Sequence, residues 1–183
     1  MKTFFALSLL ALVTMLSSTT FAQKPVTVGG APMFANKNII ENAVNSKDHT
    51  TLVAAVKAAG LVETLQGPGP FTVFAPVNAA FDALPAGTVA TLLKPENKGT
   101  LTSVLTYHVI AARLNSKALE RMIKLGGGRA ILKTVQGGQL TATMSGGVIY
   151  ITDAKGNTAR ITITNVNQSN GVIHVVDRVL LPQ

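Results

Sequence analysis

Residues 126–152 read GGGRAILKTVQGGQLTATMSGGVIYIT. Pairs or triplets of glycine separate short runs in which apolar and polar residues alternate, a pattern typical of β-strands joined by tight hairpin turns. The same pattern continues through Gly156-Asn157 and Asn170-Gly171 to the end of the chain. It predicts five strands, at 130–135, 139–144, 148–152, 159–165 and 172–181.

Helices are expected in the part of the chain that precedes these strands. Asn38 and Asp48 each stand before an apolar stretch, where their side chains can accept hydrogen bonds from the free amides of a first helical turn. They predict helices at 39–46 and 50–59, and Gly60 ends the second because glycine readily adopts the left-handed conformation. Further elements are expected at 71–74, a strand that ends before Pro76, and at 79–84, 89–93 and 98–106, which are helices.

This order of elements decides the fold class. Helices come first, strands come later, and a single early strand interrupts the helices. Such an order favours an α+β domain with an antiparallel meander over an alternating β-α chain with a parallel sheet. No interval of higher polarity and no internal repeat divides the chain, so we expect one domain.

Composition excludes several classes of protein. The chain has 183 residues, of which 47% are hydrophobic and 13% charged, so it can bury a core and is not a disordered chain. It has no cysteine, which excludes a disulfide framework, a thiolate metal cluster and a cysteine nucleophile. The net charge of +8 has two interpretations. It can attract acidic polysaccharide or anionic cell surfaces, or it can serve solubility alone. Nucleic-acid binding is not expected, because the Lys and Arg residues are dispersed and aromatic residues are few.

The first residues resemble an export signal. Met1-Lys2 precedes an apolar stretch at 4–16, and small residues precede Ala22, which predicts a secretory signal peptide at 1–22. The alternative, a retained membrane anchor, is disfavoured because 13 residues fall short of the roughly 20 that span a bilayer. The remaining 183 − 22 = 161 residues would be secreted or periplasmic. Residues 23–37 mix proline and glycine without a period and are expected to form a flexible segment, with room for one short strand or turn, before a domain at 38–183.

Three motifs resemble a known family. Residues 71–81 read FTVFAPVNAAF and are similar to the first signature of fasciclin (FAS1) domains. Residues 105–109, LTYHV, resemble the Tyr-His motif of that family, and residues 170–182, NGVIHVVDRVLLP, resemble its second signature. A single-domain secreted bacterial fasciclin protein is the closest description, although Val77 replaces a common hydroxyl residue and Ala112 a common glycine. The resemblance implies a wedge-shaped β-sandwich with several short helices packed on it, and a non-enzymatic role in adhesion.

The Tyr-His motif supplies a candidate adhesion patch. In animal relatives this region is associated with integrin binding, so the resemblance singles out Tyr107, His108, Val109 and Ile110. Successive residues of a strand point to opposite faces, and therefore we expect one of the two rings to be buried and the other to lie nearer solvent. The alternative for His108 is a buried histidine with its hydrogen bonds satisfied inside the core.

Six other motif residues are expected to serve folding. Asn78 can cap the helix that follows it, and Phe81 can anchor that helix against the core. His174 and Asp177 are three residues apart on a strand, which places them on opposite faces, so they would not form a joint site. The full set of motif residues with an expected structural role is Phe74, Pro76, Asn78, Phe81, His174 and Asp177.

No catalytic constellation is recognisable in the sequence. It has neither a G-x-S-x-G nucleophile motif nor an H-E-x-x-H zinc motif, so we expect no enzyme, no metal and no cofactor. The predicted function is a secreted, monomeric adhesion or interaction module that binds a cell-surface or matrix protein or an acidic polysaccharide. The alternative is a small-ligand carrier or sensor, with His108 or His174 lining a cavity between the helices and the strands.

Overall fold

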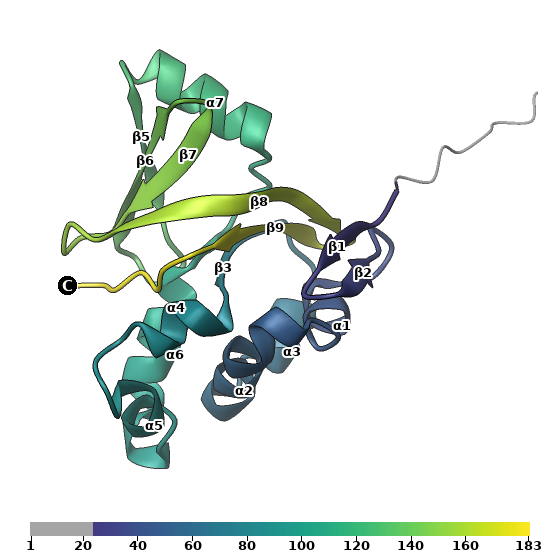
Figure 1. Ribbon diagram of the computed structural model, residues 1–183, viewed down its shortest axis with the longest axis vertical. Coiled ribbons are helices and arrows are strands. Elements are labelled where there is room, and N and C mark those ends of the chain that lie inside the picture. Colours follow the sequence, from purple (N-terminus) through teal and green to yellow (C-terminus); the bar gives the residue numbers. More distant parts are fainter. Residues whose placement is uncertain (1–23) are drawn as a thin grey trace, which may run out of the picture.

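A computed structural model describes residues 24–183 and shows a bent sheet covered by short helices (Figure 1). The predicted signal peptide at 1–22 lies outside the described residues. The seven-stranded sheet has the order β4-β3-β9-β8-β7-β6-β5. Its strands are β3 (Phe71–Pro76), β4 (Val109–Ile110), β5 (Arg129–Lys133), β6 (Gln139–Ser145), β7 (Val148–Thr152), β8 (Thr158–Gln168) and β9 (Gly171–Val176).

Helices precede and interrupt these strands. The α-helices are α1 (Ile39–Ala43), α2 (Thr50–Ala59), α3 (Val62–Gln66), α4 (Asn78–Asp82), α5 (Thr88–Leu92), α6 (Lys98–Tyr107) and α7 (Ser116–Leu125), with 3-10 turns at Lys47–His49 and Pro95–Asn97. One predicted cap and one predicted stop are confirmed. Asn38 forms a capping box with Glu41 at the start of α1, and Gly60 ends α2 in the left-handed conformation.

Strand β8 turns the sheet into a wedge. Its first residues, 158–160, pair with β7, whereas residues 161–168 pair with β9. Within the part that pairs with β9 the register shifts twice, between Ile161 and Val166, and Asn165 has a φ of 59°, which bends the strand. The half-sheet of β5, β6 and β7 therefore stands across the half-sheet of β4, β3 and β9 (Figure 1). This arrangement confirms the predicted α+β class and the wedge-shaped sandwich.

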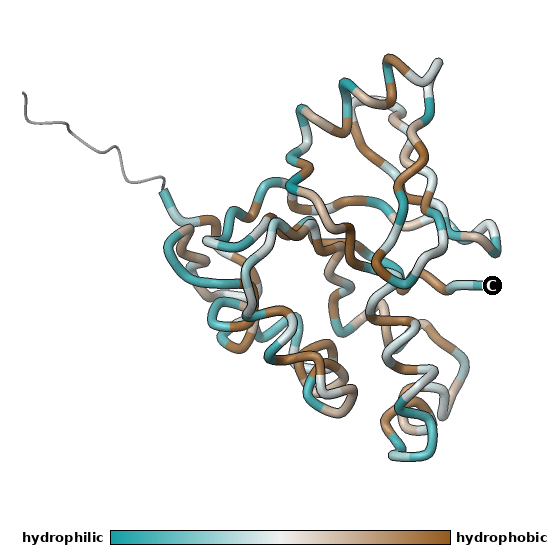
Figure 2. Tube along the Cα trace, turned by 180° about the vertical axis from the view of Figure 1, so that it is seen from behind, coloured by the Kyte–Doolittle hydropathy of each residue, from teal (hydrophilic) through white to brown (hydrophobic). Residues whose placement is uncertain are grey.

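The inside of the wedge holds one hydrophobic core. Alternate residues of β5, β6 and β7 point inward, and one face of α7 and one face of β3 and β9 complete the cluster, so apolar segments line the interior (Figure 2). Its buried residues are Phe74, Tyr107, Ile110, Leu119, Ile123, Ala130, Leu132, Leu140, Ala142, Ile149, Ile151, Ala159, Ile161, Val176 and Leu180.

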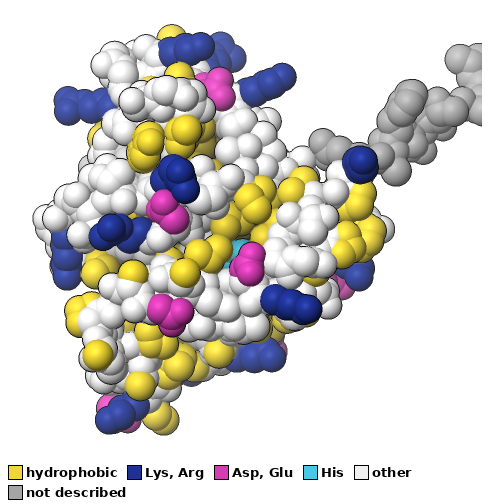
Figure 3. Space-filling model, viewed as in Figure 1, with side chains coloured by type: hydrophobic (Ala, Val, Ile, Leu, Met, Phe, Trp, Pro, Cys, Tyr) yellow, Lys and Arg dark blue, Asp and Glu magenta, His cyan; other side chains and the backbone are white. Residues whose placement is uncertain are grey.

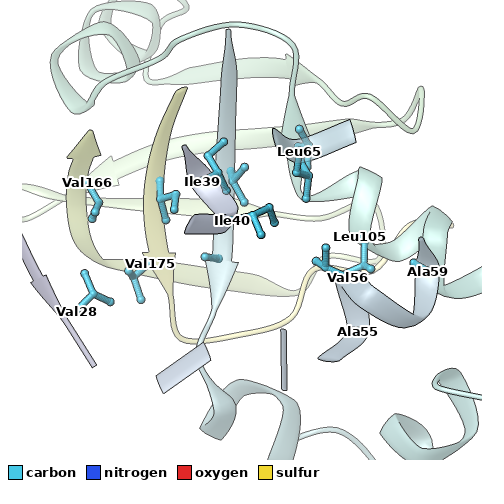
Figure 4. Packing of buried hydrophobic residues seen from close by; sticks show 14 of the residues in the cluster. Val28, Ile39, Ile40, Ala55, Val56, Ala59, Leu65, Leu105, Val166 and Val175 are labelled. Atoms are coloured by element: carbon cyan, nitrogen blue, oxygen red, sulfur yellow. The ribbon is translucent and has the colours of Figure 1, made fainter. Parts of the chain in front are cut away.

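A second core lies on the outer face of β3 and β9. There Val73 and Val175 pack against α1, α2 and α3 (Figure 4). A hairpin of β1 (Val26–Val28) and β2 (Ala31–Met33) closes this core, because Val28 and Met33 are buried in it. Order therefore begins before residue 38, which differs from the flexible segment expected at 23–37. A smaller cluster holds Phe81 of α4 against α6.

The pairing of two strands and the number of helices also differ from the expectations. Strands β3 and β9 pair in parallel, from Phe71 opposite Gly171 to Pro76 opposite Val176, so the sheet is not a pure antiparallel meander. Helices α3 and α7 were not predicted, although Asn115 caps α7 and the apolar residues of α7 face the wedge.

Candidate functional site

The Tyr-His motif lies in the interior of the protein. Helix α6 ends at Tyr107, His108 is its C-cap, and Val109 and Ile110 form β4. Each of the four side chains is at most 6% exposed, so they form no adhesion patch on the surface, and that prediction is corrected. The two rings do not alternate between core and solvent because the strand begins only after both of them, at Val109, so the strand period does not apply to Tyr107 and His108.

His108 is a satisfied core histidine. Its Nε2 lies 2.9 Å from the amide nitrogen of Leu180, and its Nδ1 lies 2.8 Å from the carbonyl oxygen of Val104. Because the amide can only donate and the carbonyl can only accept, the ring is the neutral tautomer with its proton on Nδ1. Burial lowers the pKa of His108 to about 4, which keeps the ring uncharged at neutral pH.

The hydroxyl of Tyr107 joins two turns of the chain. It donates to the carbonyl of Gln139 at 2.6 Å and accepts from the amide of Ala154 at 2.9 Å. The ring packs so closely on Gly138 that a β-carbon there would lie 2.9 Å from it. Burial also raises the pKa of the Tyr107 hydroxyl, so it remains a donor.

Replacing Tyr107 with phenylalanine should therefore reduce stability. The substitution leaves the Gln139 carbonyl and the Ala154 amide without their partner, which costs about 1–3 kcal/mol in the free energy of unfolding. Urea unfolding measures the loss, and Tyr150→Phe on a half-buried position of β7 is the matched control. An unchanged unfolding free energy in Tyr107→Phe would contradict this role.

Asp153 is a buried carboxylate that sequence reasoning missed. Its Oδ1 accepts from the amides of Lys155 and Asn157, and its Oδ2 accepts from the Asn157 side chain and the Leu181 amide. The sequence does hold a signal for this role, because an Asp three residues before a glycine, here Gly156, is typical of a turn. Asp153 and His108 together fasten the segment that follows β9.

Asn78 caps a different helix from the one predicted. Its Oδ1 accepts from the amide of Thr51 at 3.1 Å and from the hydroxyl of Thr50 at 3.2 Å, and its Nδ2 donates to the carbonyl of Lys47 at 2.9 Å. It therefore satisfies the first turn of α2 from across the fold, in the place that Asp48 was expected to fill. Its own helix, α4, has Val77 as N-cap, and this is a correction of the predicted cap.

The remaining motif residues do not converge on one site. His174 is fully buried, donates from Nε2 to the carbonyl of Leu114 at 2.8 Å, and stacks on Phe74 with ring centroids 5.9 Å apart. Asp177 is exposed and pairs with Arg160 at 3.4 Å. Pro76 and Phe81 are buried. Burial lowers the pKa of His174, and residues 24–183 contain no group of three or more acidic, His or Cys side chains placed to hold a metal ion.

Charge is distributed unevenly along the described part of the chain. Residues 24–98 contain six basic and five acidic side chains, a net of +1, whereas residues 99–183 contain nine and three, a net of +6. Lys and Arg side chains gather at the top of Figure 3, where Figure 1 places α7 and β5. We call this region the basic end; its exposed cations are Lys117, Arg121 and Lys124 of α7 and Arg129 and Lys133 of β5.

The fold brings the cations of the basic end together. Those of α7 are spaced by four and three residues, so they lie on the helix face opposite the wedge core. Those of β5 alternate with the buried Ala130 and Leu132. A tight glycine turn joins the helix to the strand, and Leu125 at its start is 80% exposed. Between residues 116 and 152 the only acidic residue is Glu120.

A model of the Fasciclin domain family matches residues 47–182. The chain belongs to the fasciclin family. It is 42% identical over 160 residues to Protein sll1483 of Synechocystis sp., covering 87% of this chain and 82% of that protein. It is also 33% identical over 166 residues to the cell surface glycolipoprotein MPB83 of Mycobacterium bovis, covering 88% of this chain and 68% of the other.

A solved structure shows the same fold. The FAS1 domain pair of the insect cell adhesion molecule Fasciclin I superimposes with a TM-score of 0.71 at 18% sequence identity. The match covers 79% of this fasciclin domain chain and 51% of the insect chain, so this chain spans about half of that domain pair. Among the described residues, every helix is too short or too polar to cross a bilayer.

Proposed function

We propose that this fasciclin protein is a non-enzymatic interaction module that binds acidic polysaccharide at a cell surface through its basic end. The uneven distribution of charge carries the proposal. Family membership supports it, because fasciclin domains are associated with cell-surface and adhesion proteins and a relative is named a cell surface glycolipoprotein. Secretion or a periplasmic location, as a monomer, is part of the same proposal.

The charge of the basic end suits a flexible polyanion. Five exposed cations surround α7 and β5 with a single carboxylate among them, so the potential at this end is positive. A polysaccharide with regularly spaced carboxylates can follow such cations around the edge of the sheet without a shaped pocket. Binding of this kind weakens as salt screens the charges.

The test is retention on an immobilised polyuronate such as alginate at low ionic strength. The variant Lys124→Glu, Arg129→Glu, Lys133→Glu should elute at clearly lower salt than the unmodified protein. The control variant Lys24→Glu, Lys47→Glu, Lys94→Glu changes the net charge by the same six units at exposed positions away from this end.

The two variants separate a site from net charge. If the control elutes close to the unmodified protein, the basic end is the binding surface. Equal losses of retention in both variants would show that net charge alone governs binding. Failure of the unmodified protein to bind at low salt would overturn the proposal.

A further inference from the structure

The second core contains a cavity of about 80 Å³. It lies between helices α1, α2 and α3 and the outer face of β3 and β9, among the side chains drawn in Figure 4. A single water needs about 10–15 Å³ by a comparable measure, so the space is several times larger than a water site. Its walls are almost entirely aliphatic, and they include Met33, Ile40 and Val73. An apolar cavity of this kind stays dry and accepts apolar molecules.

Helix α2 lines the cavity along its whole length. The wall residues from this helix and the turn before it recur with the helical period, from His49 through Leu52, Val53 and Val56 to Lys57. At a rise of about 1.5 Å per residue, the eight steps from His49 to Lys57 span roughly 12 Å. One wall of the cavity is therefore long enough for an extended aliphatic chain to lie beside it.

One end of this wall is charged. Lys57 is the only Lys, Arg, Asp or Glu among the residues that line the cavity, and it is exposed, so it lies at the rim. His49 and His108 also line the wall, but burial lowers the pKa of both, so neither adds charge at neutral pH. His174, the other histidine considered for a cavity, is not part of this wall.

We infer that the cavity binds an aliphatic monocarboxylate, that is, a fatty acid of medium chain length. The chain lies against the apolar wall of α2, β3 and β9, and the carboxylate pairs with Lys57 at the rim. This site is separate from the basic end and goes beyond the proposed polysaccharide binding, so either can fail without the other.

The methionines provide the readout. Met33 lines the cavity, whereas Met122 and Met144 pack against the wedge core. In a protein labelled with ¹³C at the methionine methyl groups, titration with decanoate should shift the Met33 resonance and leave the Met122 and Met144 resonances unchanged. Equal shifts of all three, or no shift of Met33 up to millimolar decanoate, would overturn the inference.

Two variants test the contacts. Lys57→Met keeps the aliphatic stem and removes the charge, so it should weaken decanoate about two- to fivefold, as expected for an exposed ion pair, and leave decanol unchanged. Equal affinities for decanoate and decanol in the unmodified protein would rule out the carboxylate class.

Val56→Phe fills the cavity from α2 and should abolish the Met33 shift; persistence of that shift in the folded variant would overturn the site. If this variant does not fold, the Met33 titration of the unmodified protein still tests whether decanoate binds in the cavity.

Discussion

Lowering the pH from 7 to 4 should destabilise the domain by roughly 3 kcal/mol through His108 alone. Its pKa falls from 6.5 to about 4 on folding because the ring is buried. Between these values the unfolded chain binds a proton that the folded chain does not, so stability falls as the pH decreases. The full contribution is present above about pH 6.5 and is lost towards pH 4, at about 1.4 kcal/mol per pKa unit.

Urea unfolding at several pH values between 4 and 7 measures this dependence. His108→Gln can still donate to Val104 and accept from Leu180, but it does not titrate. This variant should be less stable at pH 7 and should lose less stability on acidification than the unmodified protein. His174→Gln is the control. Burial also lowers the pKa of His174, but this variant keeps His108 and therefore keeps the contribution of His108 to the acid dependence. If His108→Gln kept the full acid dependence, the assignment to His108 would be wrong.

Local patterns predicted most of the elements. The alternation around each glycine turn depends only on residues that are close in sequence, so the strands from β5 to β8 and the start of β9 could be placed within about three residues. The predicted strand at 172–181 was too long, because β9 ends at Val176. The cap at Asn38 and the stop at Gly60 are equally local, because each requires only the first or the last helical turn. The family resemblance added the wedge, which no local period could show.

Most of the errors concern contacts between distant parts of the chain. Asn78 lies directly before α4, yet its side chain reaches the first turn of α2, and no local pattern records this choice. Pairing of β3 with β9 joins strands about 100 residues apart, so their parallel orientation could not be inferred from spacing alone. Burial of Tyr107 and His108 likewise depends on the distant turn at Ala154 and the segment at Leu180.

The basic end shows the same limit. In sequence its cations are spread between residues 117 and 133, and no short window is rich in them. Only the packing of α7 on β5 through the wedge core places them at one end of the molecule. The helical spacing of Lys117, Arg121 and Lys124 was a signal that could have been used, had α7 itself been predicted.

Replacing Phe74 with alanine should cost about 3–5 kcal/mol in the free energy of unfolding. Phe74 is fully buried on β3, faces the wedge core, and stacks on His174 of the neighbouring strand β9. Its ring therefore contacts both strands of the parallel pair of β3 and β9. Because domains of this kind are stable by only about 5–15 kcal/mol, the variant should lose a large share of its stability.

Phe34→Ala is the matched control for this prediction. Phe34 undergoes the same loss of a ring but is 40% exposed, so its replacement should cost much less. Urea unfolding of both variants at pH 7 gives the comparison. A loss below about 1 kcal/mol for Phe74→Ala would mean that the wedge collapses around the missing ring, and the packing of α7 and β6 against β3 would then be looser than the buried cluster indicates.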